Sequence, residues 1–149
     1  PISAVVGRAE VMKVAADRVF ISSTFFPNSL EQIAALKTIE ILERDRVLDK
    51  VREKGWRFGE QVARMVEESG VPAEFSGAPL LPFITFPKDP KGLYKELRTA
   101  FYTQVIRRGV FLQPYHHGYV AYRHTDEEID RAAAAVGEAL EEVRKTHLD

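Results

Sequence analysis

The sequence predicts an α+β fold in which a small antiparallel sheet packs against helices, preceded by a long bridging helix. From about residue 71 the segments follow in the order strand, strand, helix, strand, strand, helix. That order buries one face of a small sheet against helices. The 149 residues are enough for one ordinary core and too few for two comfortable ones.

The N-terminal part predicts two short elements. The apolar run 2–6 favours a buried strand that ends at Gly7, and a strand so close to residue 1 suggests a cut chain. Residues 10–16 favour a short helix, and 19–22 a brief extended segment.

The long helix begins at a recognisable signal. Ser29 and Gln32 have the spacing of a capping box, so a helix should begin close to Asn28 or Ser29. Further along, an apolar stripe at helical spacing passes Gly55, which either divides this region into two helices or loosens one; "SGVP" ends it. The stripe consists of Leu48, Val51, Phe58, Val62 and Met65.

The C-terminal half predicts a sheet and two covering helices. We expect 81–86, 110–113 and 118–123 to share one mainly antiparallel sheet, with 73–76 as a further strand. Helices at about 91–108 and 126–145 should cover it, the second begun by a capping box of Thr125 and Glu128. Residues 1–30 should be less well packed.

Composition excludes several classes of function. With 21 Lys and Arg against 22 Asp and Glu, the net charge is −1, so no strongly basic face is available for nucleic acid. The chain has no Cys, which fits a reducing compartment. No apolar run approaches the ~20 residues of a membrane helix. We therefore expect a cytoplasmic protein with neither nucleic-acid nor membrane partners.

The turn "SSTFFPNS" is the clearest candidate for chemistry. Ser22, Ser23 and Thr24 put hydroxyls and backbone amides just ahead of a helix N-terminus, an arrangement that binds anions such as phosphate. The alternative is that the hydroxyls satisfy only the turn's own backbone.

Other polar residues suggest weaker hypotheses. His116 and His117 could bind a metal, but neighbours in an extended segment point to opposite sides, so a loop or interface role is favoured. Arg107 and Arg108 suit a helix C-terminus and could also receive a carboxylate. The eight lysines have the pattern of solvated surface residues; they are Lys13, Lys37, Lys50, Lys54, Lys88, Lys91, Lys95 and Lys145.

Four blocks in order, "PISAVVGR", "FISSTFFPNSLEQIAALKTIEIL", "RRGVFLQP" and "HTDEEID", resemble the C-terminal third of class III pyridoxal-phosphate aminotransferases. The similarity is greatest to the glutamate-1-semialdehyde aminomutase branch. It implies the C-terminal part of a fold-type I transferase, with 1–46 as the incomplete end of the large cofactor-binding domain plus the bridging helix. Residues 47–149 would be the small C-terminal α+β domain.

The resemblance also implies a function. The complete enzyme would use pyridoxal 5'-phosphate for amino-group transfer, by way of an aldimine and a ketimine, on a small amino acid or amino ketone. Ser23 and Thr24 would contact the cofactor phosphate across a homodimer interface. In the family, the Schiff-base lysine lies upstream of the segment that resembles "PISA". No residue of this chain is therefore assigned a catalytic role, and the chain alone should be inactive. No residue is assigned as a metal ligand.

One stretch departs from the family. The aminomutase branch tends to have Glu in the loop after Pro114, where this chain has Tyr115, His116, His117 and Gly118. This difference argues against glutamate-1-semialdehyde as substrate. The competing hypothesis is a non-catalytic α+β binding or interaction module.

Overall fold

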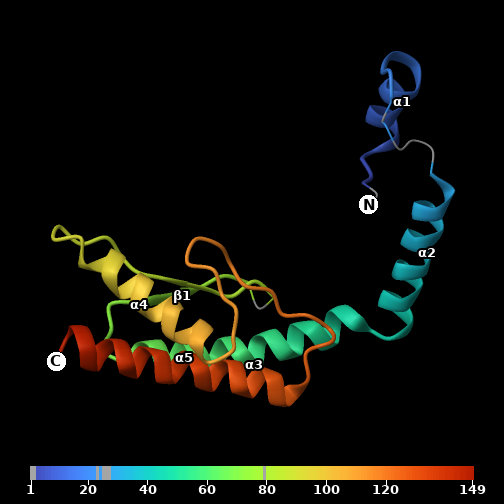
Figure 1. The fold of residues 1–149 in the computed structure, drawn as a ribbon. Helices are drawn as coiled ribbons and strands as arrows, with labels where there is room; N and C mark the ends of the chain where they lie inside the picture. Colours follow the sequence, from blue (N-terminus) through green and yellow to red (C-terminus); the bar gives the residue numbers. More distant parts are fainter. Residues whose placement is uncertain (1–2, 23, 25–27, 79) are drawn as a thin grey trace. The chain divides into compact units, whose positions relative to one another are not determined.

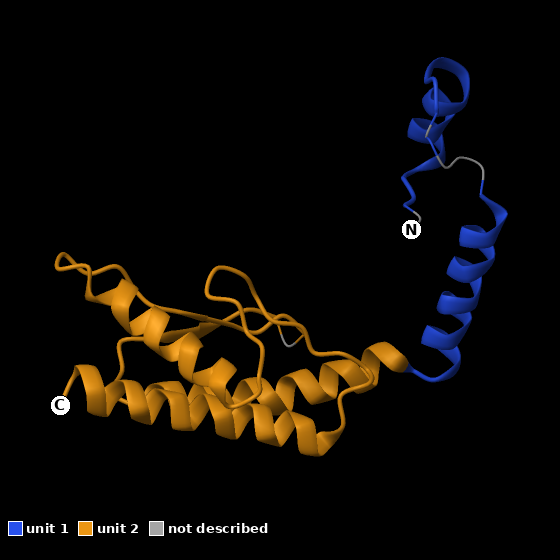
Figure 2. Cartoon of the chain, in the orientation of Figure 1, with its two compact units in different colours: residues 1–46 blue, residues 47–149 orange. Residues whose placement is uncertain are grey.

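The computed structural model describes residues 3–22, 24, 28–78 and 80–149, in two compact units, Pro1–Arg46 and Val47–Asp149 (Figure 2). The division falls between residues 46 and 47. The assignment of the first unit to a large cofactor-binding domain stays a prediction.

The described residues of the first unit form two helices, α1 (Ala9–Arg18) and α2 (Ser29–Arg44) (Figure 1). None of its described residues is buried. The expected short helix is confirmed by α1, whereas the strand expected at 2–6 is wrong for the described residues 3–6, which are irregular. A strand needs a hydrogen-bonded neighbour, and no described segment of this unit supplies one.

The start of α2 is confirmed, but its cap is a different residue. The Asn28 side chain accepts a hydrogen bond from the Leu30 amide, with Oδ1 and N 3.1 Å apart. Ser29 is therefore the first helical residue, and the capping box predicted for Ser29 and Gln32 is wrong. Asn caps helices as well as Ser does, and the extended backbone of Asn28 suits that position.

Three long helices make up most of the second unit: α3 (Val47–Glu68), α4 (Leu93–Arg107) and α5 (Asp126–His147) (Figure 1). Both α3 and α4 pack against α5. Gly55 is buried within an unbroken α3. The capping box at the start of α5 is confirmed, since Thr125 Oγ1 accepts from the Glu128 amide (3.2 Å) and Glu128 Oε2 from the Thr125 amide (2.8 Å).

The sheet is smaller than predicted. It consists of β1 (Glu74–Ser76) and β2 (Phe83–Thr85), antiparallel, with Phe75 opposite Ile84. Residues 110–113 and 118–123 form no strands, so the expected shared sheet is wrong.

Single backbone bonds take the place of the missing ladder. The Gly118 amide donates to the Pro82 carbonyl (2.7 Å) and the Val120 amide to the Leu80 carbonyl (3.1 Å). Pro82 has no N–H, so it cannot return a hydrogen bond to Gly118. Residues 118–120 therefore do not pair with residues 80–82 as a further strand of the sheet.

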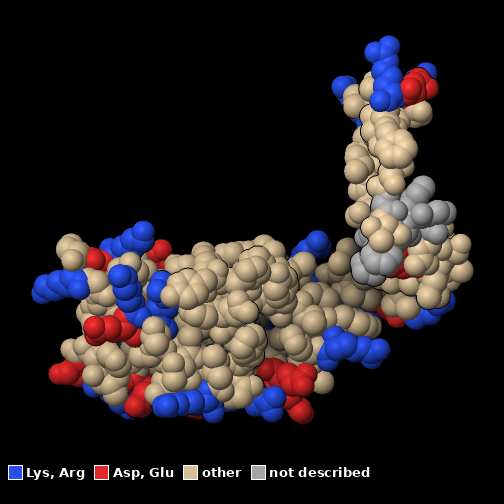
Figure 3. Space-filling view, turned by 45° about the horizontal axis from the view of Figure 1, so that its top comes forward, with Lys and Arg blue, Asp and Glu red and all other residues tan. Residues whose placement is uncertain are grey.

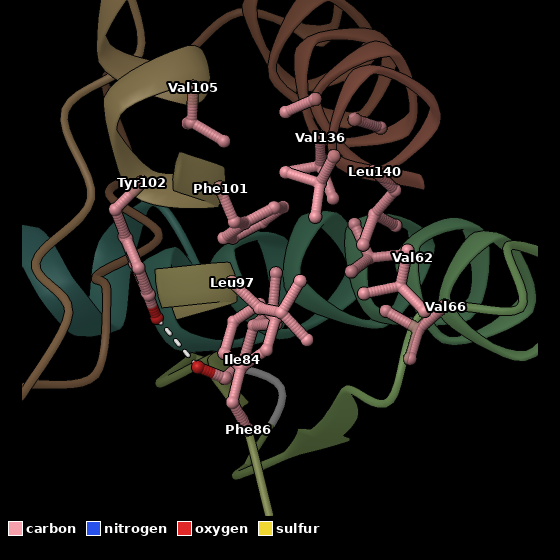
Figure 4. Packing of buried hydrophobic residues seen from close by; sticks show 14 of the residues in the cluster. Val62, Val66, Ile84, Phe86, Leu97, Phe101, Tyr102, Val105, Val136 and Leu140 are labelled. Carbon is pink, nitrogen blue, oxygen red and sulfur yellow. Dashed lines mark hydrogen bonds between the residues drawn. The ribbon is translucent and has the colours of Figure 1, made fainter. Parts of the chain in front are cut away.

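The core lies between α3, α4, α5 and β2 (Figure 4). Phe101, at its centre, is fully buried and contacts the rings of Phe86 (centroids 5.6 Å apart) and Tyr102 (5.1 Å). The buried Tyr102 hydroxyl donates to the Ile84 carbonyl at 2.7 Å, which ties α4 to β2 (Figure 4). Burial raises the pKa of Tyr102 to about 12, so the hydroxyl stays protonated at neutral pH.

Candidate functional site

The turn before α2 is the site predicted from sequence. Ser23 lies outside the described residues. Thr24 lies in a turn and is exposed to solvent, four residues ahead of the capping residue Asn28. An exposed hydroxyl before a helix N-terminus is a suitable phosphate donor. The role of Ser23 and Thr24 stays a prediction.

The second unit carries a different candidate surface, residues 109–124, which we call the aromatic loop. It begins where Gly109, at φ 81°, ends α4 with its amide donating to the Ile106 carbonyl (2.9 Å). Only Gly adopts that left-handed conformation without strain. The loop exposes 75% of Phe111, 75% of Tyr115 and 65% of Tyr119.

Lys54 of α3 anchors the C-terminal end of this loop. Its Nζ donates to the carbonyls of Tyr122 (3.2 Å) and His124 (2.5 Å). The prediction of Lys54 as a solvated surface lysine is therefore wrong, because the residue is half-buried. The sequence contained a signal for this: Lys54 lies three residues after Val51 and four before Phe58, on the apolar face of α3.

Arg98 of α4 anchors the middle of the loop. Its guanidinium carbon lies 4.4 Å from the centre of the Tyr115 ring and 5.7 Å from that of Tyr94. One terminal nitrogen donates to the Tyr115 hydroxyl at 2.9 Å. This arrangement combines cation–π stacking with a hydrogen bond, so the loop is attached to two helices. No sequence pattern marks Arg98, because its hydrogen bond joins α4 to a loop residue 17 positions away.

The adjacent histidines lie together in the loop. Their ring centres are 4.1 Å apart, His116 Nδ1 lies 3.0 Å from the His117 carbonyl, and His117 Nε2 lies 3.1 Å from the Tyr119 hydroxyl. Among the residues that the structure describes, no group of three or more His, Asp or Glu is arranged to hold a metal ion. The expectation that the two side chains point to opposite sides is wrong, because residues 116–117 are not in an extended strand and their rings lie against each other. The loop or interface role of the pair stays a prediction.

Two pockets adjoin the aromatic loop. One, of about 300 Å³, lies between the loop and α5 and is lined by Phe111, Tyr119, Glu128 and Arg131, among others. The other, of about 390 Å³, is lined by Phe111, Tyr119, Gln113 and both adjacent histidines. Phe111, Leu112, Tyr119 and His124 line both. Figure 3 shows that one face of the second unit has a broad uncharged area with Lys, Arg, Asp and Glu at its edges.

Two ionised groups of the second unit, Glu128 and Arg108, have structural partners. The backbone amide of Thr125 holds the pKa of Glu128 below its usual value, so this carboxylate stays charged as part of the capping box. Arg108 Nε, at the end of α4, donates to Glu138 Oε2 at 2.9 Å, which explains its position without a bound carboxylate.

Comparison with known proteins identifies relatives of nearly the whole chain. It is 62% identical over 144 residues to 3-aminobutyryl-CoA aminotransferase of Cloacimonas acidaminovorans, covering 97% of this chain and 35% of that protein. The chain matches one third of a class III pyridoxal-phosphate aminotransferase. It is also 28% identical over 150 residues to glutamate-1-semialdehyde 2,1-aminomutase of Archaeoglobus fulgidus, covering 94% of this chain and 36% of that enzyme. No protein-family model matches the chain.

Solved structures show the same fold. FumI of Sphingopyxis sp. MTA144, in its PLP internal aldimine form, superposes with a TM-score of 0.81 at 21% identity, covering 94% of this chain and 33% of that chain. An omega-transaminase of Sphaerobacter thermophilus gives 0.78 at 22% identity, covering 93% and 34%. The fold therefore matches the C-terminal part of fold-type I transaminases. The chain spans about a third of the length of the relatives that it matches.

None of the described helices is long and apolar enough to cross a membrane.

Proposed function

We propose that the protein containing this chain is a pyridoxal-phosphate-dependent aminotransferase that acts on a small amino substrate as a homodimer in the cytoplasm. The observation that carries the proposal is the 62% identity over 97% of the chain to an aminotransferase. The chain also shares its fold with an omega-transaminase of Sphaerobacter thermophilus, at a TM-score of 0.78.

The proposed substrate is the coenzyme A thioester of a β-amino acid. The relative with 62% identity is named for 3-aminobutyryl-CoA, whereas the glutamate-1-semialdehyde aminomutases are 27% to 29% identical. The loop difference supports the same choice, because Tyr115, His116 and His117 stand where the aminomutase branch tends to have Glu.

Ser23 and Thr24 are proposed to hold the cofactor phosphate of the neighbouring subunit. Thr24 would give its hydroxyl and amide, and Ser23 mainly its amide. The chemistry of the described donor fits phosphate, since Thr24 is exposed and α2 begins a few residues later. When bound, the cofactor supplies an electron sink for the carbon that exchanges its amino group.

The 149-residue chain alone is proposed to be inactive. In the family, the lysine that bonds to the cofactor lies upstream of the segment that resembles "PISA". Borohydride trapping with pyridoxal phosphate, followed by peptide mapping, should find no single stoichiometrically labelled lysine. Full labelling at one lysine would contradict the proposal.

The phosphate contact is tested by Thr24→Val in the complete enzyme. Valine keeps the shape but removes the hydroxyl donor, and a charge-assisted hydrogen bond shielded from water contributes ~1.5 to 3 kcal/mol. We expect cofactor affinity to fall by about tenfold or more, equivalent to ~1.4 kcal/mol. Thr38→Val is the matched control: the Thr38 hydroxyl donates only to the Ala34 carbonyl within α2 (2.8 Å), so cofactor affinity should be unchanged.

Mixed dimers test whether the contact crosses the interface. One subunit carries Thr24→Val and the other lacks the lysine that bonds to the cofactor. Weaker cofactor binding in the partner's site supports the proposal. Weaker binding in the subunit's own site, or unchanged affinity of the homodimeric variant, would leave the hydroxyls with an ordinary turn role.

A further inference from the structure

We propose that Phe111 and Tyr119 of the aromatic loop form a stacking platform for the adenine ring of an acyl-coenzyme A substrate. This inference rests on the proposed function and extends it, because it assigns recognition of the nucleotide end of the substrate to named residues of this chain.

The shape of the surface favours a flat ring. Phe111 and Tyr119 are 75% and 65% exposed, and each lines both pockets of the loop, of about 300 and 390 Å³. These volumes fall at the lower end of the range of about 300 to 1,000 Å³ typical of small-molecule sites. Aromatic side chains that border a hollow are the usual platform for a nucleic-acid base.

Polar groups surround the two rings. Gln113, His116 and His117 line the larger pocket, and the Gln113 amide both donates and accepts. The edge of adenine likewise presents both donors and acceptors. The smaller pocket has one arginine, Arg131, and one carboxylate, Glu128, so its charge does not favour phosphate. The inference therefore concerns the base alone.

The loop is held in place before any ligand arrives. Lys54 fixes the carbonyls of Tyr122 and His124 from α3, and Arg98 fixes Tyr115 from α4. The Gly118 amide adds a bond to Pro82 between these two points. A platform that is already ordered loses less entropy on binding, which increases its affinity for a ligand.

The character of this surface argues against a protein partner as its occupant. The exposed side chains of α2, by comparison, are an aliphatic series suited to packing against another protein surface: Leu30, Ile33, Leu36 and Ile39. The aromatic loop instead offers separate rings beside hollows that contain imidazole and amide groups. A base of an acyl-coenzyme A matches that chemistry, and the 62% identical relative is named for such a substrate.

The first experiment compares two substrates of the complete enzyme: 3-aminobutyryl-CoA and the same acyl group on N-acetylcysteamine, which lacks the nucleotide. Base stacking contributes about 1 to 3 kcal/mol by side-chain truncation. Phe111→Leu and Tyr119→Leu should each raise KM for the coenzyme A thioester about tenfold and leave KM for the short thioester unchanged. Phe111→Tyr and Tyr119→Phe keep the rings and should stay within about threefold of wild type.

Trp56→Leu is the matched control. Trp56 of α3 is an aromatic residue that is 56% exposed, and it lines neither pocket of the loop. It should change KM for either thioester less than twofold. An equal rise in KM for both thioesters in the Phe111 and Tyr119 variants, or no rise, would overturn the inference.

The second experiment measures binding without turnover. Saturation-transfer difference NMR with adenosine 3',5'-bisphosphate and the complete enzyme should show saturation of the adenine protons in wild type and its loss in Phe111→Leu. No adenine signal in wild type would overturn the inference even if the enzyme is an active aminotransferase. If wild type transfers amino groups from neither thioester, the proposed substrate class fails as well.

Discussion

Replacing Tyr102 with Phe removes one buried hydrogen bond while keeping the ring in the core. The Tyr102 hydroxyl donates to the Ile84 carbonyl at 2.7 Å, and only 4% of the residue is exposed. A hydrogen bond of this kind contributes about 0.5 to 1.5 kcal/mol net, and a buried carbonyl that loses its partner costs about 1 to 3 kcal/mol. We therefore expect Tyr102→Phe to lower the free energy of unfolding by about 1 to 2 kcal/mol.

Urea unfolding followed by far-UV circular dichroism measures this loss. With a denaturant slope of about 2 kcal/mol per molar, the middle of the usual range, the midpoint should fall by roughly 0.5 to 1 M while the slope stays constant. Tyr122→Phe is the matched control, because Tyr122 is only half-buried and its ring borders Lys50 and Lys54. It should change stability by less than about 0.5 kcal/mol. Equal midpoints for Tyr102→Phe and wild type would refute the reasoning.

The same tyrosine predicts a pH dependence. Its pKa is raised from 10.0 to about 12 in the folded chain because burial disfavours the phenolate. The folded state therefore keeps a proton that the unfolded state releases above pH 10. This contribution is complete below pH 10 and is lost as pH rises to about 12. The stability difference between wild type and Tyr102→Phe should therefore narrow over that interval, and a constant difference would contradict the assignment.

Three further variants test other parts of the second unit. Lys54→Met should lower stability by about 1 to 2 kcal/mol and speed amide hydrogen exchange at residues 121–125, because two carbonyls lose a charged donor. Leu140→Ala should cost about 2 to 5 kcal/mol, against less than about 0.5 for the partly exposed Leu148→Ala; similar losses would contradict the core assignment. Thr125→Ala should cost about 1 kcal/mol, and the effect should shrink in acid. Glu128 has a lowered folded pKa, so its contribution is present above its usual value of 4.5 and is lost as pH falls through the folded pKa.

The sequence by itself determined the helices of this protein and where they begin. Thr125 and Glu128 formed the predicted capping box, and α2 began next to Asn28 as expected. Capping and 3.6-residue periodicity depend on residues a few positions apart, so both can be read without knowledge of distant contacts. The turn that contains Thr24 was placed by the same local signals, and its contact with the cofactor phosphate stays a prediction.

The tertiary structure decided the sheet and the aromatic loop. Residues 110–113 and 118–123 have strand-like composition, yet neither segment forms a strand. Gly118 and Val120 donate single bonds to Pro82 and Leu80, and Pro82 has no N–H to return one, because a ladder depends on donors in a distant segment. Lys54 and Arg98 acquired their roles in the same way. Lys54 donates to the carbonyl of Tyr122, 68 residues away, and Arg98 donates to the hydroxyl of Tyr115, 17 residues away. Which helix faces which loop is a property of packing, and a side chain gains such a partner only when the folded core brings the two segments together.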